Sequence, residues 1–203
     1  MIVLKTRNGR PRQQWRGFSY SEMVRDRMTY LPMPDVGRVI DLLEFDPDTG
    51  LFRWKRKAGD ERYDRAWNKR LAGKLAGNYD RVGYLYIGID GQKYAGHRLA
   101  WLIIHGDIPD MDIDHKDGDR SNNRIRNLRL ASDSQNQANM KLPCNNTSGC
   151  KGVSWHKSNK AWQARIIVGG KKIHLGSFPN KSLAIEAYVT AARSHHGEYA
   201  RPY

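Results

Sequence analysis

The chain has 203 residues, with 35 Lys and Arg against 21 Asp and Glu, and its formal net charge at pH 7 is +14. A surplus this large favours a nucleic acid partner, because basic side chains that neutralise phosphates release counterions. No run of about 18 apolar residues is present, which argues against a membrane-spanning helix, and the N-terminus lacks the apolar core of a signal peptide. With a mean hydropathy of −0.77, we expect one or two small domains without a single large core.

Residues 1–35 are basic, with few acids and scattered aromatics. This composition is typical of a flexible arm that follows phosphates, although a tail without a role would look the same. After the arm, two apolar-aromatic runs at 42–45 and 51–54 flank Pro47-Asp48-Thr49-Gly50. A proline-led turn between such runs predicts a hairpin.

Residues 56–81 are basic and contain glycine, with Trp67 and Tyr79 interspersed. Basic residues with interleaved aromatics can line a DNA groove, and a solvated loop packed by its own aromatics would give the same pattern. The sequence leaves both interpretations open.

Alternating runs at 83–89 and 92–95 flank Asp90-Gly91, the residue pair typical of a type I′ hairpin turn. Residues 96–105 then predict a short helix that ends at Gly106. His97 and Arg98 at its start could meet phosphate, but helix capping or core packing is the commoner role of such residues.

The stretch from 111 to 140 contains most of the polar residues that are candidates for catalysis or metal binding. Asp114-His115 closes an apolar–acidic alternation, a loop rich in Gly, Asp and Asn follows, and 127–131 predict a short strand. Ser132 and Gln135 form a capping box that begins a helix. The predicted order is strand, long loop, strand, helix.

This order and spacing resemble the HNH endonuclease family and its ββα-metal fold, and the preceding hairpin and helix extend the resemblance to phage and intron members back to about residue 42. The resemblance implies that Asp114 and Asn136 hold a divalent metal, that His115 is the general base, and that Asn127 fixes the loop. A carboxylate and an amide oxygen suit Mg²⁺, or Mn²⁺ in its place. An imidazole is largely neutral near pH 7 and can act as a base. Asn139, one turn beyond Asn136, could support the site or be a helix-surface amide.

Residues 141–149 are rich in Pro, Asn, Ser, Thr and Gly and predict a linker. Cys144 and Cys150 lie in or beside it, and the chain lacks the paired Cys-x-x-Cys motifs that hold a structural zinc in some HNH proteins. We interpret both cysteines as linker thiols that form no disulfide.

Beyond the linker, period-2 alternation predicts three antiparallel strands followed by a helix from Lys181. The apolar face of the sheet should carry Val153, Trp155, Trp162, Ala164, Ile166, Ile173 and Leu175. The helix offers a stripe of small and aromatic residues at Ala184, Ala187, Tyr188 and Ala191.

Residues 149–201 resemble the APETALA2-type DNA-binding domain in their Lys-Gly-Val, Trp-Gln-Ala-Arg-Ile and Leu-Gly-Ser-Phe runs. The resemblance implies that the sheet lies in the major groove of double-stranded DNA, which is wide enough for a β surface. The candidate contacts are Lys151, Ser154, His156, Arg165, Lys172 and His174. This face has few arginines, so general DNA contact is a firmer expectation than sequence-specific reading, and a domain used only for protein contacts is the alternative.

The sequence thus predicts an α+β protein with a nuclease domain at 36–140 and an independent DNA-binding domain at 150–203, so that removing 145–203 should weaken DNA binding and leave the chemistry intact. The resemblance implies a metal-dependent endonuclease of a phage or mobile element, working in the bacterial cytoplasm as a monomer without a protein partner. A non-catalytic DNA-binding regulator on the same scaffold is the main alternative, and an RNA-binding structural protein is a weaker one.

Overall fold

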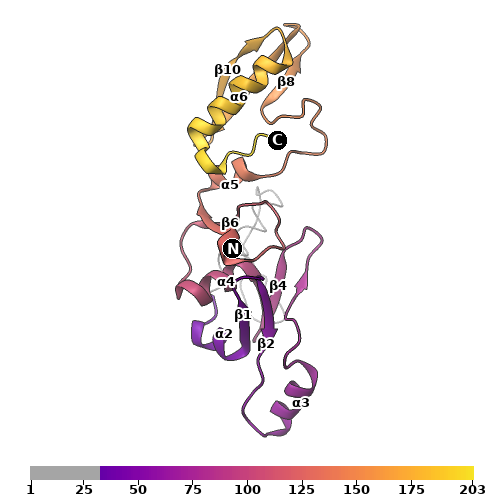
Figure 1. Cartoon of the computed structure of the whole chain (residues 1–203), viewed down its shortest axis with the longest axis vertical. Coiled ribbons are helices and arrows are strands. Elements are labelled where there is room, and N and C mark those ends of the chain that lie inside the picture. The colour runs from indigo at the N-terminus through magenta and orange to yellow at the C-terminus, as the bar shows by residue number, and fades with distance from the viewer. Residues whose placement is uncertain (1–32) are drawn as a thin grey trace, which may run out of the picture. The chain divides into compact units, whose positions relative to one another are not determined.

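The computed structural model describes residues 33–203, and these residues have an α+β fold of small antiparallel sheets and helices (Figure 1). The basic arm predicted for 1–35 lies almost wholly outside the described residues. In the part that is described, no helix is long and apolar enough to span a membrane.

The first elements are a helix and the predicted hairpin. Helix α2 (Val36–Leu42), which the sequence analysis did not predict, begins where the Asp35 carboxylate accepts a hydrogen bond from the Arg38 amide. Strands β1 (Leu43–Asp46) and β2 (Leu51–Trp54) then pair in antiparallel register. The hairpin prediction is confirmed.

The basic stretch after β2 is partly helical. Helix α3 (Arg62–Arg70) and the short strand β3 (Asn78–Tyr79) occupy it. The Trp67 indole donates a hydrogen bond to the Lys55 carbonyl, and its ring lies edge-on at 5.2 Å from that of Trp54. The loop interpretation is wrong for 62–70, because these residues form a helix, whereas DNA contact by the basic residues of 56–81 stays a prediction.

Strands β4 (Leu85–Ile89) and β5 (Gln92–Ala95) form the second predicted hairpin. Asp90 and Gly91 have φ angles of 49° and 81°, the two positive values that a type I′ turn requires. Helix α4 (Gly96–His105) follows and ends at Gly106, whose φ of 80° is left-handed. The hairpin and the helix end predicted from Asp90-Gly91 and Gly106 are therefore confirmed.

A common core joins these elements and supports the strands that follow. Its largest fully buried side chains come from α2, β1, β2, β4 and α4, namely Val39, Leu43, Phe52, Ile87, Ile89 and Leu99. The chain continues with β6 (Asp112–His115), the 3₁₀ turn η1 (Ile125–Asn127), β7 (Leu128–Ala131) and α5 (Asp133–Asn139). The predicted order of strand, loop, strand and helix is confirmed.

The first hairpin turn packs directly against the loop between β6 and β7. A Cβ atom on Gly50 would come within 2.6 Å of the backbone of Asn123 and Arg124, so only glycine fits there. The Ile125 amide donates to the Pro47 carbonyl, and the Arg124 side chain donates to the Asp48 carbonyl. The loop is therefore held from both ends of the turn.

The C-terminal part is a three-stranded sheet with one packed helix. Strands β8 (Val153–His156), β9 (Ala161–Val168) and β10 (Lys171–Phe178) stand in the order β10-β9-β8, and α6 (Lys181–His196) leads to the 3₁₀ turn η2 (Gly197–Tyr199). The core joins Val153, Ala164 and Ile166 to the helix residues Ala184, Tyr188 and Ala192.

Three sequence expectations fail in this part. Trp155 and Ile173 are exposed, although the period-2 alternation puts them on the apolar face of the sheet. A register shift between His174 and Gly176 also interrupts the alternation in β10. Cys150 is fully buried in the core and is not a linker thiol.

Residues 141–149 contain no helix or strand, in line with a linker. The residues on either side are nevertheless in contact, and 35–203 form one compact unit. The domain boundaries and the independence of 150–203 both stay predictions.

Candidate active site

The β6–β7 hairpin places its acidic and basic residues side by side. Asp114 is opposite Arg129, and His115 is opposite Leu128. The Asp114 side chain is only 7% exposed, and the Arg129 Nε donates to its Oδ2 at 3.1 Å. A buried carboxylate needs such partners, because burial without them would be costly.

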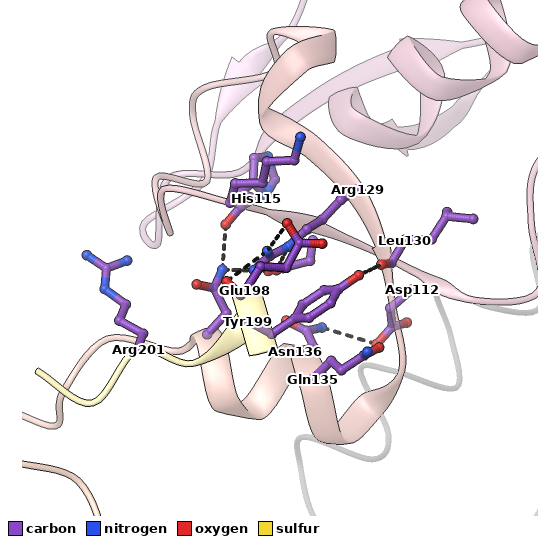
Figure 2. A network of polar contacts seen from close by, with 12 residues as sticks. Asp112, His115, Arg129, Leu130, Gln135, Asn136, Glu198, Tyr199 and Arg201 are labelled. Carbon is purple, nitrogen blue, oxygen red and sulfur yellow. Dashed lines mark hydrogen bonds and ion pairs between the residues drawn. The ribbon is translucent and has the colours of Figure 1, made fainter. Parts of the chain in front are cut away.

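Helix α5 supplies amide donors to the same strand. Asn139 is buried, and its Nδ2 donates to both Asp114 oxygens, at 3.1 and 2.9 Å, and to the His115 carbonyl at 2.7 Å. Asn136 instead donates to Asp112 Oδ2 at 3.1 Å (Figure 2). Asn139, which the sequence analysis left undecided, is therefore the amide that contacts Asp114.

The His115 ring is buried and has a defined partner. Its Nε2 lies 3.3 Å from Asn123 Oδ1, and the Asn123 amide is oriented by donating from Nδ2 to the Ser121 carbonyl. Because an amide oxygen only accepts, this contact puts the proton of the neutral ring on Nε2 and leaves Nδ1 as the basic nitrogen. Burial lowers the pKa of His115, against the opposing effects of Asn123 and nearby carboxylates.

Asn127 lies away from the acid–amide pairs and ties the loop together. Its Oδ1 accepts from the Asp117 amide at 3.2 Å, and its Nδ2 donates to the Asp117 carboxylate and to the Asn122 carbonyl. These contacts span the loop that directly follows His115. They are the contacts that a loop-fixing residue would make, and its effect on activity stays a prediction.

The two sequence-predicted metal residues and the predicted base lie on one cavity. This cavity has a volume of about 330 Å³, and Asp114, His115, Asn136, Asn139 and Arg120 are among the residues that line it. A cavity lined by a buried carboxylate and a buried imidazole is therefore the candidate active site.

Comparison with known proteins relates the segment that carries this cavity to a nuclease family. The family model described as HNH endonuclease matches residues 94–138. Protein 3.8 of Escherichia phage T7 is 38% identical over 107 residues, which cover 52% of this chain and 87% of that protein. This chain belongs to the HNH endonuclease family.

Two further similarities complete the comparison of this HNH family member. An uncharacterized HNH endonuclease, L560 of Acanthamoeba polyphaga mimivirus, is 32% identical over 118 residues, covering 57% of this chain and 60% of that protein. A solved structure of the HNH homing endonuclease I-HmuI, titled for DNA binding and cleavage, matches 82% of this chain and 91% of that chain, with 19% identity and a TM-score of 0.38.

HNH nucleases generally use a divalent metal ion, and the oxygen donors of the cavity fit one. The Asp114 carboxylate accepts one hydrogen bond at Oδ1 and two at Oδ2. An ionised carboxylate has about four lone-pair sites, so Oδ1 keeps one. Asn136 donates through Nδ2, and its amide oxygen remains a hard ligand. Within 33–203, no group of three or more His, Cys, Asp and Glu side chains is arranged to hold a metal.

The predicted DNA contacts of the C-terminal sheet are only partly brought together. A second cavity, of about 430 Å³, is lined by Lys151, Ser154, Arg165 and Lys172 together with residues of α5. Lys151 is half-buried and donates from Nζ to the Ala138 carbonyl at 2.7 Å, and burial, with the charge of Arg201, lowers its pKa to about 8.

The two histidines predicted for the DNA-contacting face do not line that cavity. His156 Nδ1 accepts a hydrogen bond from the Asn159 amide, so this nitrogen is engaged in the turn that follows β8. His174 is exposed on β10. Contact of any of these six residues with DNA stays a prediction.

Sequence reasoning missed the roles of two neighbours of the site. Asn123 was counted only as part of a loop rich in Gly, Asp and Asn, although it is buried and contacts His115. Arg129 was counted only as part of a strand, although strand pairing puts it beside Asp114. The register of the β6–β7 hairpin was the signal that could have found Arg129.

Proposed function

We propose that this protein is a metal-dependent HNH endonuclease that hydrolyses phosphodiester bonds in double-stranded DNA. One observation carries the proposal: a buried carboxylate, Asp114, and a buried imidazole, His115, whose Nε2 contacts the Asn123 amide oxygen, line the same cavity in the HNH segment. We further propose a homing-type role in a phage or mobile element, in a bacterial host cell and as a monomer.

His115 acts as the general base. Its Nδ1 takes a proton from the attacking water, while Asn123 holds the proton on Nε2 and Asn127 holds the loop that follows. Asp114 and Asn136 would hold the Mg²⁺ or Mn²⁺, which when bound supplies charge stabilisation at the scissile phosphate and the leaving oxygen. The products carry 3′-hydroxyl and 5′-phosphate ends.

The C-terminal sheet serves as the DNA-binding part in this proposal. Lys151, Arg165 and Lys172 lie at the second cavity with Ser154, while His156 and His174 lie elsewhere on β8 and β10. Cationic groups gathered on one surface suit phosphate contact, which gives affinity without sequence reading.

The deciding experiment incubates supercoiled plasmid and phage DNA with the full chain, in Mg²⁺ or in chelator. We expect cleavage only with the metal, and we expect His115→Ala to abolish it while DNA affinity stays within a few-fold. His195→Ala, which removes an exposed imidazole of α6, is the matched control and should cut as the wild type does. Intact DNA that is nonetheless bound would favour the non-catalytic regulator.

The metal residues are tested separately. Asp114→Asn removes a charge from a hard-cation site, and Asn136→Ala removes an amide oxygen, so both variants should need more Mg²⁺ for half-maximal cleavage. Partial recovery with Mn²⁺ is expected, because Mn²⁺ generally binds such ligands more tightly. An unchanged metal titration for both variants would place the ligands elsewhere.

A further inference from the structure

The last residues of the chain return to the nuclease motif. Residues 197–203, called here the C-terminal segment, follow α6 and include η2. The Tyr199 hydroxyl donates to the Leu130 carbonyl of β7 at 2.7 Å (Figure 2). The Arg201 guanidinium donates to the Asp117 carbonyl at 2.8 Å. The segment thus contacts both the second strand of the motif and the loop beyond His115.

Arg129 connects this segment to the candidate metal carboxylate. Its side chain is 8% exposed, and its Nε donates to Asp114 on one side. On the other side, Nη1 donates to the Glu198 carbonyl at 3.2 Å and lies 3.7 Å from the Glu198 carboxylate. The guanidinium carbon lies 3.8 Å from the centroid of the Tyr199 ring, a cation–π contact.

Arg129 contacts Asp114 through one nitrogen only. Arginine and carboxylate groups frequently form two parallel hydrogen bonds, but here only Nε contacts Asp114, and Nη1 is directed to Glu198. Nη2 is buried and has no hydrogen-bond partner within the described residues. Without Glu198 and Tyr199, the guanidinium could turn onto the carboxylate and occupy the lone pair that remains on Oδ1.

We propose that the C-terminal segment is a positioning element of the nuclease site, in which Tyr199 and Glu198 hold Arg129 so that it orients Asp114 and leaves Oδ1 open to the divalent cation. This inference rests on the proposed function, because it concerns the cation that Asp114 would hold. Outer partners of a metal ligand typically change metal affinity by about 10- to 100-fold when removed. Tyr199 and Arg129 are positioning residues here and do not themselves touch the cation.

The test measures Mn²⁺ binding to the full chain without DNA, from the electron paramagnetic resonance signal of free Mn²⁺. Tyr199→Leu removes the ring and the hydroxyl, and it should weaken binding by about ten-fold. Tyr199→Phe keeps the ring over Arg129 and should bind within about three-fold of wild type. Tyr203→Leu changes a tyrosine of the same segment that is 61% exposed and should have no effect.

A second variant guards against misfolding of Tyr199→Leu. Glu198 has a side chain that is 71% exposed, so Glu198→Lys should fold, and it should weaken Mn²⁺ binding by about two- to five-fold by repelling Arg129. Glu186→Lys makes the same charge change at an exposed position of α6 and is its control. Circular dichroism and thermal unfolding of every variant establish that the protein compared is folded.

A structural role alone would lower the melting temperature of Tyr199→Leu and leave the Mn²⁺ dissociation constant unchanged, and that result would overturn the inference. Equal weakening by Tyr203→Leu or Glu186→Lys would also overturn it, as would a wild-type chain that binds no Mn²⁺. A wild-type chain that binds Mn²⁺ through Asp114 but leaves every DNA intact contradicts the proposed function and leaves the inference standing.

Discussion

His97 gives this fold a sensitivity to acid that can be measured. Its ring lies edge-on to that of His115, with the centroids 5.2 Å apart, and tilted against that of Tyr84 at 5.6 Å. Burial, reinforced by the neighbouring His115 and Arg98, lowers the pKa of His97 to about 3. The His97 ring beside the candidate base is therefore neutral near pH 7.

The sign of the effect on stability follows from linkage. The unfolded chain binds a proton at His97 below its ordinary pKa of about 6.5, whereas the folded chain does not until about pH 3, so stability is lost as the pH falls through that window. With these two values, acidification from about pH 7.5 to about pH 5 removes about 2 kcal/mol of unfolding free energy through this one residue.

The assay is urea unfolding of the wild type and of His97→Gln at the two pH values. The variant has no group to protonate at this position, so the wild type should lose about 2 kcal/mol more than the variant between them. Nuclear magnetic resonance of the His97 ring provides the direct check. A titration midpoint near 6.5 in the folded protein, with equal pH dependence of the two unfolding free energies, would refute the reasoning.

Three further predictions concern contacts around the candidate site and the sheet. Asn123→Ala should lower the cleavage rate with little change in Mn²⁺ affinity, because the His115 ring loses the contact that fixes its proton on Nε2. The ¹⁵N chemical shifts of the imidazole, measured by nuclear magnetic resonance, would report the change of tautomer. Asn139→Ala should lower the unfolding free energy by about 1–3 kcal/mol, measured in urea, because buried acceptors lose their donor. Arg165→Ala with Lys172→Ala should make the salt slope of DNA binding shallower by about 0.9 for each phosphate that the variant no longer neutralises, and an unchanged slope would remove both residues from the interface.

The elements that sequence predicts well are those fixed by local chemistry. Asp90-Gly91 adopts the two positive φ angles expected of it, and Gly106 ends α4 as expected. The Ser132–Gln135 capping box is present with both of its hydrogen bonds. In each case the deciding interactions lie within a few residues, so no knowledge of the packing is needed.

The choice between Asn136 and Asn139 could not be made from the sequence in this way. Strand β6 and helix α5 form two successive acid–amide pairs, Asp112 with Asn136 and Asp114 with Asn139. Which amide meets which carboxylate depends on the rotation of α5 about its axis. Tertiary packing sets that rotation, and the residue spacing alone does not.

Arg129 marks the limit of sequence reasoning more sharply. Hairpin register alone puts it beside Asp114, so the first contact follows from strand pairing. A buried guanidinium has five donors, however, and one carboxylate cannot satisfy them. A covering segment with further acceptors is therefore required, and the sequence cannot identify it, because Glu198 lies 69 residues away in a single 3₁₀ turn. The buried charge predicts that such a segment exists, and only the fold shows that the chain's own last residues supply it.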